Sequence, residues 1–395
     1  MAKDISSFNG IIGITTFTKL VLNITRRLAY PFAPAFARGL NVELSAVTAL
    51  IAMTQASSFM GPVGAWFADR YGYKIIMLAA VAMLTIGTFA AGLIPVYSVV
   101  VVSLFLAAMA KSIFDPTLQA FIGKYVPISQ RGKVIGITEI SWAGSTLAGI
   151  PLAGILIERF SWQVPFWILS ILSLVCFFLI LKFMPKDKAS DRSVRPDQAA
   201  KVTPANWKTI FKNRQALGLF GFGFFMTLAN DNLFVIYGAW LEKSYGLSLA
   251  AIGFGTIFIG LSEILGEGST ALFSDRIGLK RSVVGGTVLS AAAYMILPAA
   301  DTGLGWTLAG MFLVFFSFEF TYVTSMSLGT ELVPELRAST MAAFFAIAGL
   351  GRVIGAFSGG MVWSGYGIQG ISLVSGVCTT LALAALLTGF SGSKK

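Results

Sequence analysis

The 395-residue sequence contains no histidine, and only 12% of its residues are charged. A soluble globular domain usually carries about 25% charged residues, so this chain has too little polar surface to cover a globule that faces water. The absence of histidine also limits proton chemistry. Any side chain that binds and releases a proton inside this protein must be a carboxylate, unless a chain of water molecules carries the proton.

Cysteine is scarce too, and the motifs of cofactor chemistry are missing. Cys176 and Cys378 both fall in apolar segments, where we interpret them as small packing residues that indicate neither a disulfide nor a metal site. The phosphate-binding pattern G-x-x-x-x-G-K-[ST] does not occur, so nothing supports ATP-driven work. We therefore expect no enzyme activity, no cofactor and no metal.

Long apolar runs are abundant, and the composition is 56% hydrophobic with a mean hydropathy of +0.79. A helix needs about 20 mostly apolar residues to cross about 30 Å of hydrocarbon, whereas membrane strands are alternating segments of about ten residues. Twelve runs are long enough, which predicts an all-α integral membrane protein with twelve transmembrane helices. The runs lie near residues 10–37, 45–66, 75–94, 99–122, 133–157, 163–183, 214–240, 249–272, 282–299, 305–328, 338–362 and 367–390.

The basic residues are distributed unevenly, although a net charge of +11 alone could suggest a nucleic-acid partner. Of the 29 lysines and arginines, 21 lie in the even-numbered loops and at the two ends, and five lie inside spans. The opposite loops hold only three, which are Arg38, Arg159 and Lys243. Basic residues accumulate on the cytoplasmic side of membranes. The distribution predicts a multi-pass protein of the plasma or bacterial inner membrane, with both termini in the cytoplasm and no nucleic-acid partner.

One long polar loop divides the chain into two near-equal parts. The stretch KDKASDRSVRPDQAAKVTP follows Pro185 and is poor in apolar residues, which is typical of a flexible or partly helical linker. We predict a six-helix bundle over residues 1–183, a cytoplasmic linker over 184–213 and a second six-helix bundle over 214–395.

The two halves repeat one another. The stretch GAWFADRYGYK at residues 64–74 recurs as TALFSDRIGLK at residues 270–280, an offset of 206. Gly149 and Gly154 match Gly355 and Gly360 at the same offset. Parallel repeats of six spans, with a binding site between them near the bilayer midplane, occur in transporters that work by alternating access. The repeat therefore predicts two related bundles with pseudo-two-fold symmetry.

The repeated loop G-x-x-x-x-D-R-x-G-x-K resembles the signature loop of the major facilitator superfamily, and the resemblance extends over essentially the whole chain. Glycine permits a tight turn between helices, and a carboxylate is favoured beside a helix N-terminus. In that family the loop latches the cytoplasmic side shut in the outward-open state. The alternative is that these charges only fix the topology. The resemblance implies a cytoplasmic gate formed by Asp69, Arg70, Gly72, Lys74, Asp275, Arg276, Gly278 and Lys280.

A second resemblance lies in the fifth span, where we predict a helix-packing motif of Gly144, Gly149, Pro151 and Gly154. Glycines let helices approach closely, and proline permits a kink. The motif is similar to the glycine–proline motif of antiporters in the family, although it reads Gly-Ile-Pro in place of Gly-Pro. The likeness implies the drug and sugar efflux branch, which exchanges substrate for protons. The alternative is ordinary close packing of spans 5 and 8.

Charged residues inside the spans are the main indication of a site, because each costs about 2.5–3.5 kcal/mol on insertion scales and usually faces a cavity or a partner. Their formal charges sum to +2 in the first half and −3 in the second, a total of −1. This total argues against a site that only holds an anion. It favours charges that pair across the halves, with spare carboxylates to bind protons. The residues are Lys19, Arg26, Arg27, Lys111, Asp115 and Glu139, then Asp231, Glu263, Glu267, Glu319 and Arg352.

Helical spacing sorts these residues further. Lys19, Asn23 and Tyr30 share one face of span 1 with either Arg26 or Arg27, whose side chains diverge by about 100°. Lys111 and Asp115 are one turn apart in span 4 and can simply neutralise each other. The predicted substrate-binding residues are Asn23, Arg26, Arg27, Tyr30, Lys111 and Tyr322. The predicted proton-coupling residues are Asp115, Asp231, Glu263 and Glu319.

The repeat suggests how these residues meet. Moving Arg26 and Arg27 by 206 residues leads to positions next to Asp231, and moving Lys111 leads to a position beside Glu319. Spans 1, 4, 7 and 10 line the central cavity in the resembled family. We hypothesise that Arg26 or Arg27 with Asp231, and Lys111 with Glu319, lie in or beside the translocation site. Static salt bridges are the alternative, which we favour for Glu139, Glu267 and Arg352.

Rocking of the halves would make and break such a pair, and so change the proton affinity of its carboxylate. The leading interpretation is a proton-coupled antiporter that exports a small amphipathic or organic-anion compound and acts as a monomer in the lipid bilayer. Two alternatives stay open. One is a proton symporter that imports a small anionic metabolite, and the other is a lipid or lysolipid flippase.

Overall fold

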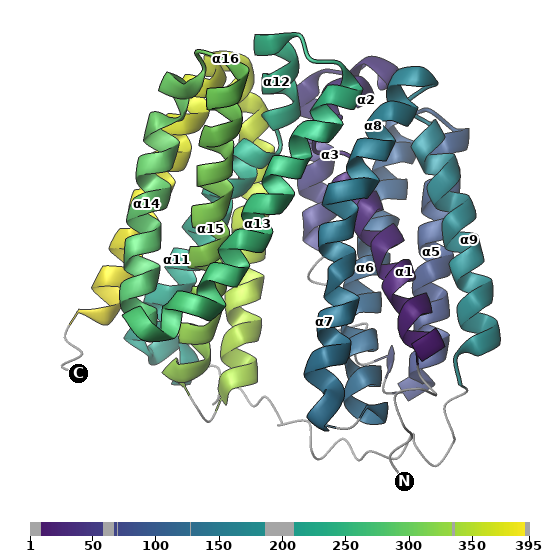
Figure 1. The fold of residues 1–395 in the computed structure, drawn as a ribbon, viewed down its shortest axis with the longest axis horizontal. Coiled ribbons are helices and arrows are strands. Elements are labelled where there is room, and N and C mark those ends of the chain that lie inside the picture. The colour runs from purple at the N-terminus through teal and green to yellow at the C-terminus, as the bar shows by residue number, and fades with distance from the viewer. Residues whose placement is uncertain are drawn as a thin grey trace. The chain divides into compact units, whose positions relative to one another are not determined.

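The computed structural model describes residues 9–57, 67–68, 70–126, 128–185, 209–333 and 336–391. Regular structure in these ranges is helical throughout, without a β-strand (Figure 1). The first half contains α1 (Asn9–Arg27), α2 (Ala33–Leu40), α3 (Leu44–Ala56), α5 (Tyr73–Leu93), α6 (Tyr97–Tyr125), α7 (Ile128–Gly144), η3 (Ser145–Gly149), α8 (Ile150–Arg159) and α9 (Val164–Phe183). The second half contains α11 (Arg214–Phe234), α12 (Tyr237–Tyr245), α13 (Leu249–Ile277), α14 (Leu279–Ala300), α15 (Leu304–Leu332) and α16 (Arg337–Phe390).

Each of the twelve predicted spans coincides with helix in the described ranges, but several spans are broken. Span 1 consists of α1 and α2, and span 7 consists of α11 and α12. Span 5 consists of α7, the π-helical turn η3, and α8.

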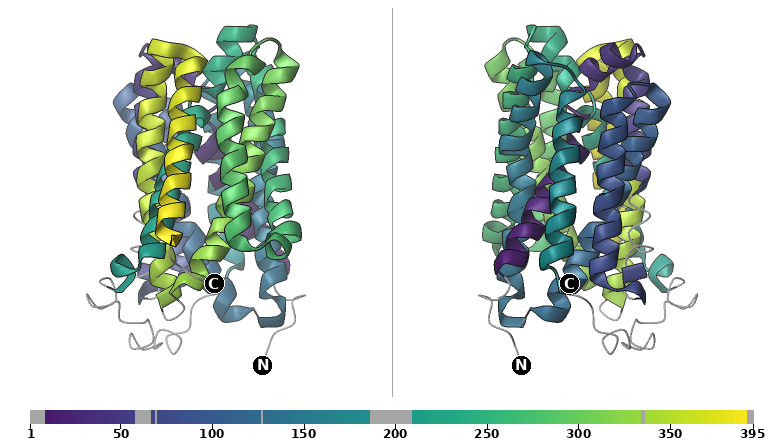
Figure 2. Two further views of the ribbon diagram at one scale, coloured as in Figure 1. Left: turned by 90° about the vertical axis from the view of Figure 1, so that its left-hand side faces the viewer. Right: turned by 90° about the vertical axis from the view of Figure 1, so that its right-hand side faces the viewer.

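The last two spans are both contained in α16. This helix covers 54 residues, and Gly367 inside it leaves helical geometry with φ 58° and ψ −151°. A straight helix of that length would extend about 80 Å, far more than the hydrocarbon of a bilayer. The chain instead reverses direction near Gly367, and the two arms lie side by side (Figure 2).

The helix α1 is unusually polar for a membrane span. Nine helical segments of the described ranges are long and apolar enough to cross a membrane, and α1 is not among them. Its 19 residues include Lys19, Arg26 and Arg27. The lack of apolarity in α1 therefore comes from the side chains that the sequence selects as site candidates.

The helix α9 shows how the outer helices are built for lipid. Ile171, Leu174 and Phe178 are 62%, 45% and 57% exposed and recur at helical spacing along one face. Ser173 and Cys176, on another face, are fully buried. Apolar side chains outside and small or polar side chains inside are typical of helices that pack in a bilayer, where small residues allow close contact. Cys176 and Cys378 are free thiols, the first buried and the second half-buried.

The chain forms two compact units, which do not follow the two sequence halves residue by residue. Unit 1 comprises Met1–Glu43, Met53–Pro196 and Ser248–Phe254, and unit 2 comprises Leu44–Ala52, Asp197–Leu247 and Gly255–Lys395. Each unit thus includes the first turns of a helix, α13 or α3, whose remainder belongs to the other unit. Most of the predicted linker, residues 186–208, lies outside the described ranges, and the predicted boundaries at 183 and 214 stay a prediction.

Candidate functional site

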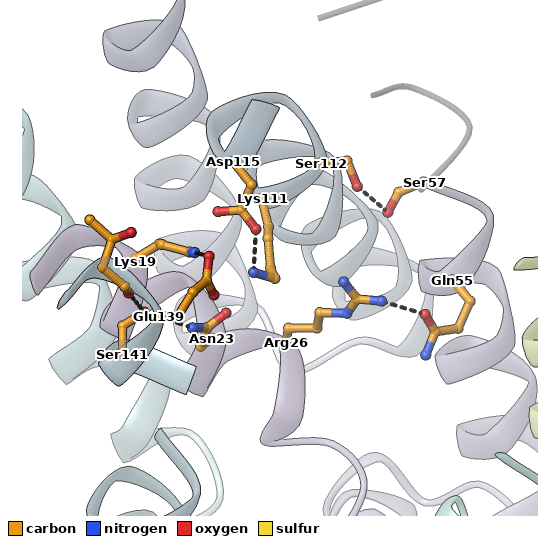
Figure 3. A network of polar contacts seen from close by, with 11 residues as sticks. Lys19, Asn23, Arg26, Gln55, Ser57, Lys111, Ser112, Asp115, Glu139 and Ser141 are labelled. Carbon is orange, nitrogen blue, oxygen red and sulfur yellow. Dashed lines mark hydrogen bonds and ion pairs between the residues drawn. The ribbon is translucent and has the colours of Figure 1, made fainter. Parts of the chain in front are cut away.

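Polar contacts join α1 to α7 in unit 1 (Figure 3). The Lys19 ammonium lies 2.5 Å from a carboxylate oxygen of Glu139. One turn further along α1, the Asn23 amide donates to the Ser141 hydroxyl at 3.2 Å. Lys19 is 4% exposed and Asn23 is fully buried. Both residues of α1 therefore direct their polar groups to partners in the fifth span.

Arg27, a further turn along α1, also faces the fifth span. Its guanidinium donates to the Thr146 hydroxyl, and its Cζ lies 3.8 Å from the centre of the Trp142 ring. Thr146 belongs to η3, and π-helical turns of this kind often occur at functional sites. A hydroxyl and an aromatic face thus hold a guanidinium that is only 5% exposed.

Arg26 points to a different neighbour. Its Nη2 donates to the Gln55 carboxamide oxygen at 2.8 Å, and the Gln55 amide in turn donates to the Tyr30 hydroxyl. Gln55 lies near the end of α3. The two adjacent arginines therefore diverge, as a helical step of about 100° requires. The face expected to carry Lys19, Asn23, Tyr30 and one arginine is divided, since Tyr30 turns with Arg26 toward α3.

Lys111 of α6 is nearly buried and has two kinds of neighbour. Its ammonium lies 2.5 Å from a carboxylate oxygen of Asp115, one turn later, which is the neutralising i, i+4 pair that the spacing allowed. It also lies 5.7 Å from the centre of the Trp142 ring. In Figure 3 the pair of Lys111 with Asp115 lies between two other cations, Lys19 and Arg26. Both of these cations are close enough to Lys111 to interact with it electrostatically.

The charges of this cluster do not balance. Lys19, Arg26, Arg27 and Lys111 are positive, and Asp115 and Glu139 are negative, so their formal sum is +2. We call these six residues the cationic cluster. Charges in a water-poor interior interact strongly, so an excess of this sign favours an anion nearby.

Asp231 of α11 is a fully buried carboxylate of unit 2. One of its oxygens lies 3.4 Å from Nη1 of Arg352 on α16, and their side chains are 1% and 30% exposed. The Arg352 guanidinium also lies 5.8 Å from the centre of the Tyr322 ring on α15. Tyr322 stacks on Phe318, with ring centres 5.3 Å apart. This arrangement joins three helices around one ion pair.

Two further predicted carboxylates lie on neighbouring helices of unit 2. Glu263 on α13 is 5% exposed, and Glu319 on α15 is half-buried. The helices are close at this level, because a Cβ placed on Gly266 would lie 2.9 Å from the Glu319 Cβ. Both carboxylates are thus held among helices.

The predicted pairs between the halves stay a prediction. Each ion pair described above joins two residues of the same unit: two pairs belong to unit 1 and one belongs to unit 2. Arg352, for which we favour a static salt bridge, is the cation beside Asp231, one of the predicted proton-coupling residues.

Sequence reasoning missed several partners. Gln55, Ser141 and Trp142 were not candidates, yet each contacts a predicted site residue. The fifth span does carry a visible signal, because Thr138, Ser141 and Ser145 recur at helical spacing. No comparable pattern marks Gln55.

The repeated loop has the turn geometry that its glycines predict. Gly72 and Gly278 have φ values of 98° and 93°, which favour glycine. Lys74 is 8% exposed and donates to the carbonyl oxygens of Leu181 and Met184 at 2.7 and 2.6 Å. This lysine therefore caps the C-terminus of α9, a favourable place for a cation.

The other predicted gate residues give a less complete picture. Lys280, the repeat counterpart of Lys74, is exposed and lies 5.4 Å from the centre of the Phe390 ring. Arg70 and Arg276 are exposed as well. Asp69 and the Asp275 side chain lie outside the described residues. The gate stays a prediction.

The glycines of the fifth span mark close helix contacts. A Cβ on Gly149 would overlap Ile24 of α1, and one on Gly154 would lie 2.6 Å from the Leu249 carbonyl oxygen. Gly144 is less crowded, with a Leu20 methyl at 3.4 Å from its hypothetical Cβ. Pro151 lies in the first turn of α8, directly after the π-helical turn η3.

Comparison with known families decides the class of protein. The sequence model of the Major Facilitator Superfamily matches residues 15–356, and a second match covers residues 219–393. The chain belongs to the Major Facilitator Superfamily. It is therefore a secondary transporter and not an enzyme, and its predicted fold class, an all-α integral membrane protein of twelve helices, is confirmed.

Several curated superfamily members are similar to the chain. The uncharacterized transporter YceJ of Bacillus subtilis is 27% identical over 304 residues, 77% of this chain and 75% of the relative. The hexuronate transporter of the same organism is 25% identical over 286 residues, 68% of this chain and 65% of the relative. The multi-drug resistance efflux pump PmrA of Streptococcus pneumoniae is 22% identical over 389 residues, 93% of each chain.

Solved structures of superfamily members show the same fold. An inward-facing bacterial homologue of the human lysosomal transporter Spinster has a TM-score of 0.78 at 15% identity, and covers 99% of this chain and 97% of its own. A D-xylose–proton symporter has the same score and identity, and covers 96% of each chain. Such identities show the fold alone, so the efflux branch of the superfamily stays a prediction.

Proposed function

We propose that this superfamily member is a proton-coupled antiporter that exports a small organic anion. The observation that carries the proposal is the cationic cluster. Two of its four cations are paired with carboxylates at 2.5 Å, and the six residues keep a formal charge of +2. A carboxylate substrate would offset this excess and could form charge-assisted hydrogen bonds with Arg26 or Lys111.

Asp231 is the proposed proton carrier. The carboxylate is almost fully buried, and its 3.4 Å contact with Arg352 is long for a charge-assisted hydrogen bond. A small movement of α11 against α16 would separate the pair, and a carboxylate that loses its cation in a buried site binds a proton more readily. Asp231 therefore couples helix movement to proton binding, while Glu263 and Glu319 are secondary candidates.

Export is supported by two features. The efflux pump PmrA is similar over 93% of this chain, and the fifth span carries the glycine–proline motif that resembles antiporters. We further propose that both termini are cytoplasmic, and the basic residues of the even-numbered loops support this orientation. We also propose that the protein acts as a monomer.

Proton symport of an anionic metabolite is the second candidate. It is favoured by the similarity to a hexuronate transporter, whose named substrate class carries a carboxylate. Both candidates require the same cationic cluster, and they differ only in the direction of the proton relative to the substrate.

The test uses the full-length protein in liposomes. A pH gradient is imposed, and transport is measured for organic anions such as D-glucuronate and benzoate, for a neutral sugar and for a cationic amphiphile. Antiport moves protons against the anion, and symport moves both together. Selective transport of neutral or cationic compounds would overturn the anion proposal.

A matched pair of variants tests the proton carrier. Asp231→Asn is expected to abolish transport driven by the pH gradient while exchange of labelled for unlabelled anion persists. Glu267→Gln makes the same chemical change at an exposed carboxylate of the same unit and should leave both activities intact. Gradient-driven transport by Asp231→Asn at the wild-type rate would exclude Asp231 as the carrier.

A further inference from the structure

Trp142 of α7 lies close to two cations that come from two other helices. The Arg27 guanidinium of α1 lies 3.8 Å from the centre of its ring, and the Lys111 ammonium of α6 lies 5.7 Å from the same centre. Both distances are within the roughly 6 Å over which a cation is attracted to an aromatic face.

The residues of the fifth span that contact Arg27 in these two interactions, Trp142 and Thr146, are uncharged. Trp142 and Thr146 are separated by four residues, across the junction of α7 with η3, and both contact the guanidinium. A ring face and a hydroxyl attract a cation without adding negative charge. Lys19 is held differently in the same cluster, because a carboxylate neutralises it at 2.5 Å.

This difference matters for an anion site. A carboxylate at position 142 would hold Arg27 and Lys111 equally well but would lower the formal charge of the cluster by one. An indole keeps two cations close to one ring and leaves the cluster at +2. The electrostatic repulsion between Lys111 and the nearby cations Arg26 and Lys19 is then reduced when an anion binds near them.

We propose that Trp142 is a positioning residue that holds Arg27 and Lys111 together as one cationic subsite for the carboxylate of the transported anion. The proposal rests on the proposed organic-anion function. Without the ring, Arg27 loses its aromatic contact, and Lys111 keeps the pair with Asp115 one turn later. The subsite then keeps its formal charge but loses the geometry in which both cations lie near one ring.

The test compares Trp142→Leu, Trp142→Phe and the wild type in proteoliposomes, with D-glucuronate as the probe. Loss of the aromatic face is expected to raise KM for glucuronate about thirtyfold, the lower end of the range for a desolvated cation–aromatic contact, with kcat changed less than about twofold. Trp142→Phe retains a ring and should restore most of the affinity. A residue that only fills space would lower the thermal stability without such a split.

Trp167→Leu is the matched control. Trp167 is half-buried in unit 1 like Trp142, but it contacts Phe89, with ring centres 5.3 Å apart, and Gly92. The same loss of an indole there should leave KM for glucuronate unchanged. If Trp142→Leu transports glucuronate with the wild-type KM, the positioning role is wrong while the anion function stands.

Fluorescence provides a second measurement if Trp142→Leu does not fold. Glucuronate binding should change the tryptophan emission of the wild type, and Trp142→Phe should lose most of this change. An unaltered response in Trp142→Phe would contradict the proposal. If the wild type transports neither glucuronate nor benzoate but accepts neutral or cationic compounds, the proposed function fails and the role of Trp142 fails with it.

Discussion

The ion pair between Lys19 and Glu139 is asymmetric at the level of single residues. The Lys19 side chain is 5% exposed, whereas the Glu139 side chain is 48% exposed. A charge that faces solvent or headgroups stays solvated when its partner is removed, but a buried charge does not. The two members of one pair therefore contribute to stability in different ways.

This asymmetry predicts that Glu139→Ala is more harmful than Lys19→Met. The first variant leaves a buried ammonium without its carboxylate and should cost about 3 kcal/mol, whereas the second leaves a half-exposed carboxylate and should cost about 1 kcal/mol or less. Thermal unfolding of the purified protein in detergent measures both. The double variant should recover most of the stability that Glu139→Ala loses, and equal losses in the two single variants would contradict the argument.

The site could be predicted only in part at the residue scale. The pair of Lys111 with Asp115 follows from helical spacing, because its members are four residues apart. Arg352 and Asp231 are 121 residues apart, and a single sequence contains no signal for a contact of that separation. The same limit hid Trp142, since its partners come from α1 and α6.

At the scale of elements, glycines fix how closely α16 lies against α11. A Cβ on Gly355 would overlap the backbone at Leu228, and one on Gly359 would lie 2.6 Å from the Asn232 carbonyl oxygen. Backbone atoms in a helix cannot move aside as a flexible side chain can. The contact between these two helices therefore requires hydrogen at both positions.

Gly355→Ala is expected to push α16 away from α11 and lower the unfolding temperature by several degrees, since overpacking costs about 1–3 kcal/mol. Gly365→Ala, on the same helix, has nothing within 4 Å of the added Cβ. It should be neutral or slightly stabilising, because alanine favours helix. Thermal unfolding of the two variants checks this, and an equal response would show that helix flexibility, not contact, determines the effect.

The elements themselves were largely predictable, because apolar runs of membrane length leave few alternatives to helix. Their interruptions were harder to predict. The break between α1 and α2 contains Pro31, which could have marked it. The π-helical turn in the fifth span depends on how its residues fit against α1, and periodicity alone does not indicate it.

At the scale of the whole molecule, the internal repeat extends to tertiary contacts. Gly149 packs against Ile24 of the first span, and its counterpart Gly355 packs against Leu228 of the seventh. Further along, Gly154 meets the first turn of α13. Its counterpart Gly360 meets Thr48, in the second turn of α3. The offset of 206 therefore describes packing as well as sequence.

The division of α3 and α13 between the two units has a consequence for the gene. A fragment that ends at Pro196 lacks Ser248–Phe254, and a fragment that begins at Asp197 lacks Leu44–Ala52, so neither encodes a complete unit. Each fragment expressed alone should be degraded, because the glycine surface around Gly154 or Gly360 stays uncovered. Expressed together, the fragments should accumulate and co-purify.

Quantitative immunoblotting of membranes from cells with one or both fragments measures this, and the intact chain serves as the control. Fragments that accumulate equally well alone and together would contradict it. If the expectation holds, a split of the reading frame would be tolerated only where both pieces are synthesised into the same membrane. The two halves would then be inherited as one unit of selection, although their sequences repeat one another.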